Sequence, residues 1–318
     1  MNLAPIVLFV YNRLDHTRQT IEALQKNDLA NESELYIYSD AAKDNYAESE
    51  VLKVREYINT VSGFKEIHIV KRADNWGLAN SIIDGVTHIV NQYGKIIVIE
   101  DDIVTSPGFL NYMNEALTLY KDDKKIMHIA GYLPETSGQE SLPNSFFLRF
   151  MSCWGWATWK DSWSNANWDA QYLFDKINTK KALKKFNLNN AISFHRQLED
   201  NINGSITTWA IKWFSTIFIY DGLCLYPHKS FVKNIGLDGS GVHSGIDTSN
   251  SIDELLTSIN LNRIELKESR IGKKYLMRFY KYGKYSSFKF RIHHNVNNFR
   301  NKKVSTVKKV LRKISAKL

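Results

Sequence analysis

The chain has 318 residues, of which 43% are hydrophobic and 13% aromatic, so it can bury a large core and is too apolar for a disordered protein. No run approaches the ~18 consecutive apolar residues of a membrane-spanning helix, and we expect no secretory signal. The two cysteines, Cys153 and Cys224, match no metal or disulfide pattern and are expected to be free thiols in the cytoplasm.

Charge is distributed unevenly along the chain. The net charge is +9, yet residues 262–318 alone carry 18 Lys and Arg against two acids, which leaves a net charge of −7 for residues 1–261. The sequence therefore predicts an acidic body over residues 1–260 and a basic, aromatic-rich, helical tail over residues 261–318.

The body alternates between strand-like and helix-like patterns. Apolar, β-branched runs predict buried strands at 5–11, 34–40, 66–70, 95–99, 126–132, 145–150 and 223–227. Helical spacing predicts helices at 16–26, 48–61, 78–92, 108–119 and 170–197. Strands separated by helices pair in parallel, so we expect an α/β fold with a Rossmann-like, mostly parallel sheet flanked by helices.

Three acids, Glu100, Asp101 and Asp102, directly follow the strand at 95–99. Buried carboxylates without partners are costly, so these acids are expected at the carboxyl end of the strand, where open α/β sheets bind ligands. Their hard oxygen donors suit Mn²⁺ or Mg²⁺. A solvated acidic turn would have the same sequence pattern, and for an isolated acidic triplet such a turn is the commoner explanation.

Three further features fit glycosyl transfer from a nucleotide-sugar. The second strand ends in an acid, Asp40; four Trp fall within the ten positions 154–163; and a glycine-rich loop at 234–243 contains His243. Such a reaction needs a nucleotide site, a cation for the diphosphate, a sugar-stacking surface, a base for the acceptor hydroxyl and a loop that excludes water. Trp156 and Trp159 are expected to line the sugar pocket, although a core element under the sheet fits them equally well.

An ordered series of segments resembles the GT-A fold glycosyltransferases, especially N-acetylglucosaminyltransferase I and its bacterial capsule and O-antigen relatives of the family 2 type. The segments are residues 7–24, 36–40, 75–85 and 99–103, followed by Pro107-Gly108-Phe109. The resemblance covers roughly residues 3–245. In that family an acidic triplet of the form Glu-Asp-Asp replaces the Asp-x-Asp motif.

The resemblance implies roles for individual residues. Asp102 would bind the metal that bridges the donor diphosphate, and Glu100 and Asp101 would hold the ribose and the donor sugar. Arg13 would contact the diphosphate, and Asp40 would bind the uracil of a UDP-linked donor. The alternatives are a surface arginine at position 13 and a helix cap at position 40. His243 would touch the phosphates or the metal, unless it is a loop histidine without a role.

The resemblance is weakest at the catalytic base. The family places an Asp in a segment that aligns with Trp209–Trp213, but the residues between these Trp, including Ala210, are not acidic. The pair Glu199-Asp200 resembles the acidic pair that supplies the base in related inverting enzymes. Asp200 is therefore predicted first, Glu199 second and Asp161 third, the alternative being a solvated pair at a helix end.

The basic tail suits the surface of an anionic bilayer. We therefore expect a peripheral enzyme at the inner face of the plasma membrane, with a nucleotide-sugar donor and a glycan or lipid-linked acceptor as partners. A merely solvated tail is one alternative, and nucleic-acid binding is disfavoured because the body is acidic and shows no nucleic-acid module.

The predicted function is an inverting, metal-dependent hexosyl or N-acetylhexosaminyl transfer in surface polysaccharide synthesis. One competing function is a nucleotidyltransferase that makes nucleotide-sugars, against which the missing Gly-rich nucleotide loop near the N-terminus counts. The other is a non-catalytic glycan-binding relative, which the absence of an acid at position 210 leaves open.

Overall fold

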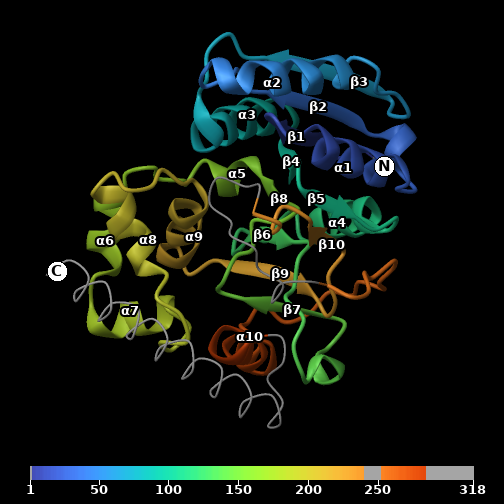
Figure 1. Cartoon of the computed structure of the whole chain (residues 1–318). Coiled ribbons are helices and arrows are strands. Elements are labelled where there is room, and N and C mark those ends of the chain that lie inside the picture. The colour runs from blue at the N-terminus through green and yellow to red at the C-terminus, as the bar shows by residue number, and fades with distance from the viewer. Residues whose placement is uncertain (1, 240–251, 284–318) are drawn as a thin grey trace, which may run out of the picture.

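The computed structural model describes residues 2–239 and 252–283 (Figure 1). An eight-stranded sheet of order β3-β2-β1-β4-β8-β6-β9-β7 forms its centre, and β5 and β10 form a separate two-stranded sheet. The strands are β1 (Ile6–Val10), β2 (Glu34–Ser39), β3 (Glu66–Lys71), β4 (Lys95–Glu100), β5 (Ile103–Thr105), β6 (Ile126–Ala130), β7 (Ser145–Leu148), β8 (Trp156–Trp159), β9 (Leu223–Pro227) and β10 (Val232–Asn234).

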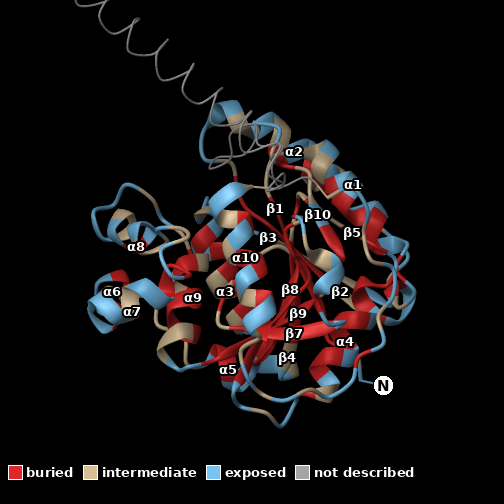
Figure 2. Ribbon diagram, turned by 90° about the horizontal axis from the view of Figure 1, so that it is seen from below, coloured by how far each residue is buried: buried red, intermediate tan, exposed pale blue. Residues whose placement is uncertain are grey.

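The helices connect these strands and cover both faces of the sheet. The helices are α1 (Leu14–Gln25), α2 (Asn45–Ile58), α3 (Gly77–Tyr93), α4 (Phe109–Leu119), α5 (Lys160–Trp163), α6 (Ala170–Ile177), α7 (Lys180–Phe186), α8 (His195–Ile202), α9 (Ala210–Ile219) and α10 (Arg270–Tyr282), with 3₁₀ turns η1 (Ala30–Glu32) and η2 (Gln139–Ser141). Apolar residues of α1, α2 and α4 pack on one face, and those of α3, α5, α6, α9 and α10 pack on the other. Figure 2 shows buried strands in the interior and exposed outer helix faces.

The predicted α/β fold is confirmed. β3, β2, β1 and β4 are parallel neighbours, as their helical connections require. The next strand, β8, runs antiparallel between β4 and β6, and β7 runs antiparallel to β9 at the outer edge. The sheet is therefore mostly parallel, with two reversed strands in its second half.

The single helix predicted over residues 170–197 is instead three helices, α6, α7 and α8. Thr179 caps α7 by accepting a hydrogen bond from the backbone N–H of Ala182. Three consecutive residues after α7, Leu188, Asn189 and Asn190, have positive φ, a conformation that a helix cannot continue through. Local capping and backbone reversal thus break a pattern whose apolar spacing alone looked continuous.

The first part of the predicted tail packs on the body. Tyr275, Leu276 and Phe279 of α10 are buried, and Gly272 lies so close to the Phe146 ring that a Cβ there would approach within 2.4 Å. The Tyr275 hydroxyl donates to the carbonyl of Pro134 at 2.8 Å. These aromatic residues therefore contribute to the core, not to a bilayer contact, and the packed body extends past the predicted boundary at residue 260.

The rest of the predicted tail, from residue 284 onward, lies outside the described residues. Across residues 2–239 and 252–283, every helix is too short or too polar to cross a bilayer.

Candidate active site

The predicted nucleotide and metal residues lie at one edge of the sheet. Asp40 follows β2, Arg13 follows β1 and Glu100 ends β4, and these three strands are parallel neighbours. The backbone N–H of Asp40 donates to the carbonyl of Val10, while Glu100 is paired in register with Phe9. Asp40 and Glu100 are thus separated by one intervening strand, roughly 10 Å. The carboxyl ends of β2, β1 and β4 bring these residues together, as the sequence predicted.

Arg13 joins the loop after β1 to the acids after β4. Its Nη2 donates to Asp101 Oδ1 and, at 2.9 Å, to Asp102 Oδ2, and its Nε lies 3.4 Å from Asp101 Oδ2. Nη1 is buried and has no hydrogen-bond partner among the described residues. Burial lowers the pKa of Arg13, but the two ion pairs more than offset this and raise it overall. The guanidinium therefore stays charged and keeps a free donor at the acidic edge.

The acids outnumber their cationic partner. Burial, then repulsion by Asp102 and Asp101, raises the pKa of Glu100 to about 8. Burial also raises the pKa of Asp101 to about 6, although Arg13 opposes the shift. A pKa near 8 leaves Glu100 largely uncharged at neutral pH, yet the carboxylates of Asp101 and Asp102 still outnumber the single guanidinium, and a divalent cation would neutralise this surplus negative charge.

Asp102 is the acid best placed to ligate such a cation. Its side chain is partly exposed, at 15%, whereas Asp101 is buried against Arg13. A single Asp suits Mg²⁺ or Mn²⁺, which keep several waters and take further oxygens from a substrate phosphate. The donor set therefore fits the expected metal, with Asp102 as the protein ligand.

A glycine brings a second segment over the acids. β10 pairs antiparallel with β5, and the backbone N–H of Ile235 donates to the carbonyl of Asp102 at 2.9 Å. A Cβ on Gly236 would lie 2.3 Å from Asp102 Oδ2 and 2.7 Å from Arg13 Nη1. Only a residue without a side chain fits here unless the two charged groups move. The sequence placed a glycine-rich loop near this point but could not show what it contacts.

Asp40 is buried and holds the start of α3. Its Oδ1 accepts hydrogen bonds from the N–H groups of Ala41 and Trp76, and its Oδ2 accepts one from Gly77 at 2.8 Å. This is the capping role that the sequence left open beside uracil binding. Because a carboxylate has about four acceptor positions, Oδ2 keeps capacity for one more donor.

Trp156 and Trp159 are buried in the core, which argues against the predicted place of their rings in the sugar pocket. They form β8, and Trp156 is fully buried, with stacked contacts to Trp209 at 5.1 Å and His128 at 5.3 Å between ring centroids. Trp159 is paired with Lys95, at the amino end of β4 and away from the acids. The Trp-rich stretch is mainly a core element, the alternative that the sequence left open.

The tryptophan nearer the acids is Trp154, which sequence reasoning did not select. It lies two residues before β8, whose first residue, Trp156, is paired with Val98 near the carboxyl end of β4. Trp154 is half-buried and makes an edge contact with Tyr132 at 4.4 Å. Its neighbour Cys153 is a free thiol whose pKa is raised by burial and then by Glu100, which places this segment beside the acids.

The candidate bases lie on different elements. Glu199 is exposed and Asp200 half-buried on α8, which packs mainly on α6 and α9. Asp161 is exposed on α5, and the N–H of the preceding Lys160 donates to the carbonyl of Gly94. That contact is at the amino end of β4, whereas the acids lie at its carboxyl end. Asp161, the third-ranked candidate base, is therefore at the opposite edge of the sheet from the acids.

His243 lies outside the described residues. The last described part of its loop approaches the site, because Asp238 Oδ2 lies 3.3 Å from His16 Nε2 of α1. His16 in turn contributes a weak electrostatic stabilisation to charged Asp101.

Comparison with known proteins finds one family. A family model described as Glycosyl transferase family 2 matches residues 6–197. No curated protein sequence matches the chain.

Solved structures show distant likenesses. One match is the mannosyltransferase PcManGT from Pyrobaculum calidifontis in complex with GDP-Man and Mn²⁺. The match covers 68% of this chain and 69% of the PcManGT chain, at 10% identity and a TM-score of 0.39. Residues 1–349 of S. aureus TarS cover 72% of this chain at 11% identity and a TM-score of 0.39, and this chain spans 59% of that structure. A second TarS structure matches at 14% identity and a TM-score of 0.30, covering 43% of this chain and 22% of its own.

Proposed function

We infer that this chain, which belongs to glycosyl transferase family 2 and is therefore a glycosyltransferase, takes its sugar from a UDP-linked donor with the help of Mn²⁺ or Mg²⁺. The observation that supports this most is the cluster at the carboxyl edge of the sheet. There Arg13 reaches from β1 to Asp101 and Asp102 after β4, and Asp40 lies one strand further along. Such an edge is where open α/β sheets hold nucleotides.

The diphosphate would lie against the Arg13–Asp102 ion pair. When bound to Asp102, the cation would neutralise the charge that develops on the departing nucleoside diphosphate. Arg13 contributes independently, because Nη1 has no hydrogen-bond partner among the described residues and would bind a phosphate oxygen once the segment at Gly236 moves off it, while Nη2 stays on the acids. In this arrangement Asp101 is the buried counter-ion that orients the Arg13 guanidinium.

The other donor contacts follow from position along the edge. Asp40 Oδ2 would accept the N–H of uracil, and Glu100 would face the ribose or the sugar. We propose Trp154 in place of Trp156 and Trp159 as the aromatic wall of the sugar site, because it is half-buried and next to the acids. His243 remains proposed as a phosphate or metal contact.

The reaction is proposed to be a single displacement that inverts the anomeric carbon. Asp200 would remove the proton from the acceptor hydroxyl, with Glu199 as the second candidate. Of the two, Asp200 is the less exposed, and the N–H of Ile206 donates to its backbone carbonyl, so its position on α8 is fixed.

We further propose that the acceptor is a glycan or lipid-linked intermediate of a surface polysaccharide, and that the enzyme works at the inner face of the plasma membrane. Residues 284–318 support this, since they carry 11 Lys and Arg and no acid. The exposed face of α10 adds Arg270, Lys274 and Lys281.

The proposal is tested by incubating the full chain with a panel of nucleotide-sugars, with Mn²⁺, with Mg²⁺ and with chelator, and measuring release of the free nucleotide. We expect one UDP-sugar to be hydrolysed slowly with metal and not with chelator. Asp102→Asn should lower that rate about 100-fold or more. Without the Asp102 carboxylate the metal would bind poorly, and the negative charge that develops on the departing diphosphate would not be neutralised. Asp122→Asn, an exposed carboxylate outside the site, is the matched control.

Two outcomes would contradict the proposal. Full turnover by Asp102→Asn would show that Asp102 is not the metal ligand that the reaction needs. Metal-dependent UDP binding without turnover on any donor or acceptor would identify the chain as a non-catalytic relative.

A further inference from the structure

A second cluster of ligating side chains lies at the opposite edge of the same sheet. Glu34 begins β2 and Glu66 begins β3, and the two residues are paired in register across the parallel strands. His68 follows Glu66 by two positions, so both side chains are on the same face of β3. One carboxylate oxygen of each Glu and one ring nitrogen of His68 all lie within 4.8 Å of one another. Within residues 2–239 and 252–283, no other group of three or more His, Cys, Asp or Glu side chains gathers this closely.

His68 presents a nitrogen without a hydrogen bond to this cluster. Its Nε2 is buried and has no hydrogen-bond partner among the described residues, and it lies 3.5 Å from Glu66 Oε1. The ring stacks on Tyr36 with a centroid distance of 4.3 Å and an interplanar angle of 16°. The stacking holds the ring so that Nε2 faces the carboxylates, and a buried ring nitrogen without a partner is costly unless something occupies it.

Glu34 is held in place by two donors. The Tyr93 hydroxyl donates to Oε2 at 2.6 Å, and Lys65 Nζ donates to Oε1 at 3.0 Å. These bonds, the tyrosine first, lower the pKa of Glu34 and keep it a carboxylate. Lys65 is 58% exposed, so its ion pair is weak and an entering cation can displace it. Tyr93 would remain as the group that orients the ligand from behind.

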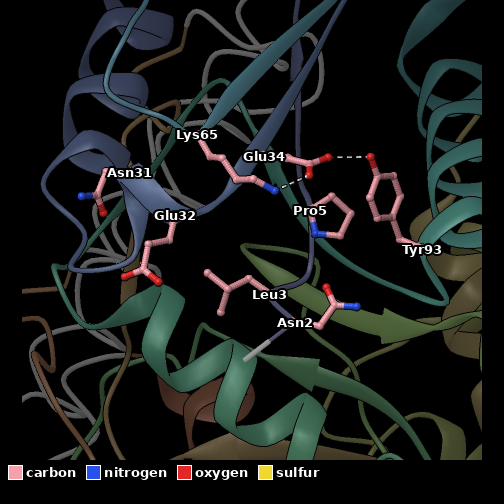
Figure 3. Close-up of a pocket in the computed structure, with 8 residues that line it drawn as sticks. All are labelled: Asn2, Leu3, Pro5, Asn31, Glu32, Glu34, Lys65 and Tyr93. Atoms are coloured by element: carbon pink, nitrogen blue, oxygen red, sulfur yellow. Dashed lines mark hydrogen bonds and ion pairs between the residues drawn. The ribbon is translucent and has the colours of Figure 1, made fainter.

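A cavity of about 400 Å³ opens beside Glu34. Figure 3 shows Glu34 between Lys65 and Tyr93, with Asn2, Pro5 and Glu32 around the same space. The cavity reaches the cluster at Glu34, and its lining does not include Glu66 or His68.

We propose that Glu34, Glu66 and His68 bind a zinc-like divalent transition metal that joins β2 to β3. One imidazole and two carboxylates are a donor set that zinc accepts, with water in the remaining position. Bonds of about 2.1 Å place two ligand atoms at most about 4.2 Å apart, so a pair of atoms near the 4.8 Å limit would have to approach slightly. Glu66 can do so, because it is 60% exposed and begins an edge strand.

This metal would be structural and separate from the donor site. β2 runs from Glu34 to Ser39 and is followed by Asp40, so the cluster is roughly 20 Å from the catalytic edge at the rise per residue of a strand. β3 is held in the sheet by one neighbour only. A metal shared by Glu34 and Glu66 would fasten that edge strand at its first residue.

The test measures zinc bound to the full chain by equilibrium dialysis at about pH 7.5, where an ordinary imidazole is neutral, together with Co²⁺ absorption spectra. Other groups of the chain can also bind zinc, so the comparison is between variants. The double variant Glu66→Gln/His68→Gln should bind one equivalent less than the unaltered chain and lose the Co²⁺ absorption of a nitrogen-containing site. Zinc should raise the melting temperature of the unaltered chain by several degrees more than that of the variant.

Glu32→Gln is the matched control, because Glu32 is an exposed carboxylate that lines the same cavity without belonging to the ligand set. It should retain the full equivalent. Equal zinc stoichiometry in the unaltered chain and the double variant would overturn the proposal, as would an equal loss in Glu32→Gln. Asp102→Asn should leave this equivalent unchanged, which distinguishes the site from the donor metal.

Discussion

Arg13 Nη2 donates to Asp102 Oδ2 at 2.9 Å, although the two residues are 89 positions apart in the chain. The bond ties the loop after β1 to the tip of β4, and the same nitrogen also contacts Asp101. The orientation of the proposed metal ligand therefore depends on a cation from a different strand.

Replacing Arg13 by Gln should weaken both the fold and the reaction. Asp101 is only 5% exposed and would lose its cationic partner. We expect a loss of about 2–3 kcal/mol of unfolding free energy, below the range for a fully buried pair because Arg13 is 19% exposed. Arg13→Lys should recover much of the stability but little of the transfer rate, since the compact ammonium lacks the planar, spread donors with which the guanidinium contacts both carboxylates and would reach a phosphate. Urea titrations and initial rates measure the two effects, and a Gln variant as stable as the unaltered chain would contradict this account.

Gly236→Ala should damage the reaction while leaving the fold largely intact. The new Cβ would displace Asp102 Oδ2 and Arg13 Nη1, which are side-chain ends that can move. We expect transfer to fall about tenfold or more, with little change in melting temperature.

Gly272→Ala is the contrasting control for Gly236→Ala. Its Cβ would meet the Phe146 ring in the core, so it should lower the melting temperature and leave the KM for the donor unchanged. If both variants behaved alike, the contact of Gly236 with the acids would not be functional.

Asp200→Asn should lower kcat about 100-fold or more with little change in the KM for the donor, because the base acts on the acceptor. Glu199→Gln and Asp161→Asn should be near normal. A chemical-rescue series with nucleophiles smaller than the natural acceptor, such as azide, would show whether the missing group is a base. If Glu199→Gln alone lost activity, the assignments of the pair would be reversed.

Trp154 and Trp156 should respond oppositely to alanine. Trp156→Ala removes a fully buried ring from the core and should cost about 3–5 kcal/mol of unfolding free energy. Trp154→Ala removes a half-buried side chain beside the acids, so it should raise the KM for the sugar substrate with a smaller loss of stability. Unchanged kinetics in a folded Trp154→Ala variant would remove it from the sugar site.

His128 should make the fold sensitive to acid. Burial lowers its pKa from 6.5 to about 3, while Nε2–H donates to the carbonyl of Ser152 and Nδ1 accepts from Trp213. Between these two pH values the unfolded chain binds a proton that the folded chain does not, so stability is complete above pH 6.5 and falls as pH decreases toward 3. This residue should contribute a slope of up to ~1.4 kcal/mol per pH unit.

The check is a set of urea titrations between pH 4 and 7, inside the window set by these pKa values. His128→Gln, which can keep both hydrogen bonds, should show a shallower decline than the unaltered chain. Parallel declines would mean that His128 is already protonated in the fold.

Sequence reasoning could predict the parallel half of the sheet because each strand is a short run of mainly β-branched, aliphatic or aromatic residues. The same logic brought Asp40, Arg13 and Glu100 to one edge, since parallel neighbours end together. The prediction depended on local pattern and on chain direction, both of which the sequence contains.

Two of the errors have a common cause in contacts distant along the chain, whereas the break in the helix predicted over residues 170–197 is local. β8 lies antiparallel between β4 and β6, and nothing in the sequence near Trp156 indicates that its strand will be flanked on both sides. Likewise, the aromatic residues of α10 resemble bilayer anchors in the sequence, because the sequence does not show that α10 packs on β7. Arg13 had no local signal for its buried ion pairs, and only its family resemblance pointed to it.

The position of β8 also affects how the protein is made. β1 to β4 are complete once residue 100 has been synthesised, but β4 receives its second neighbour only when Trp156 pairs with Val98, 58 positions later. At ribosomal rates this is a delay of about 3–12 s. During that time the nascent chain carries an apolar strand with an unpaired edge, the kind of surface that chaperones shield from aggregation.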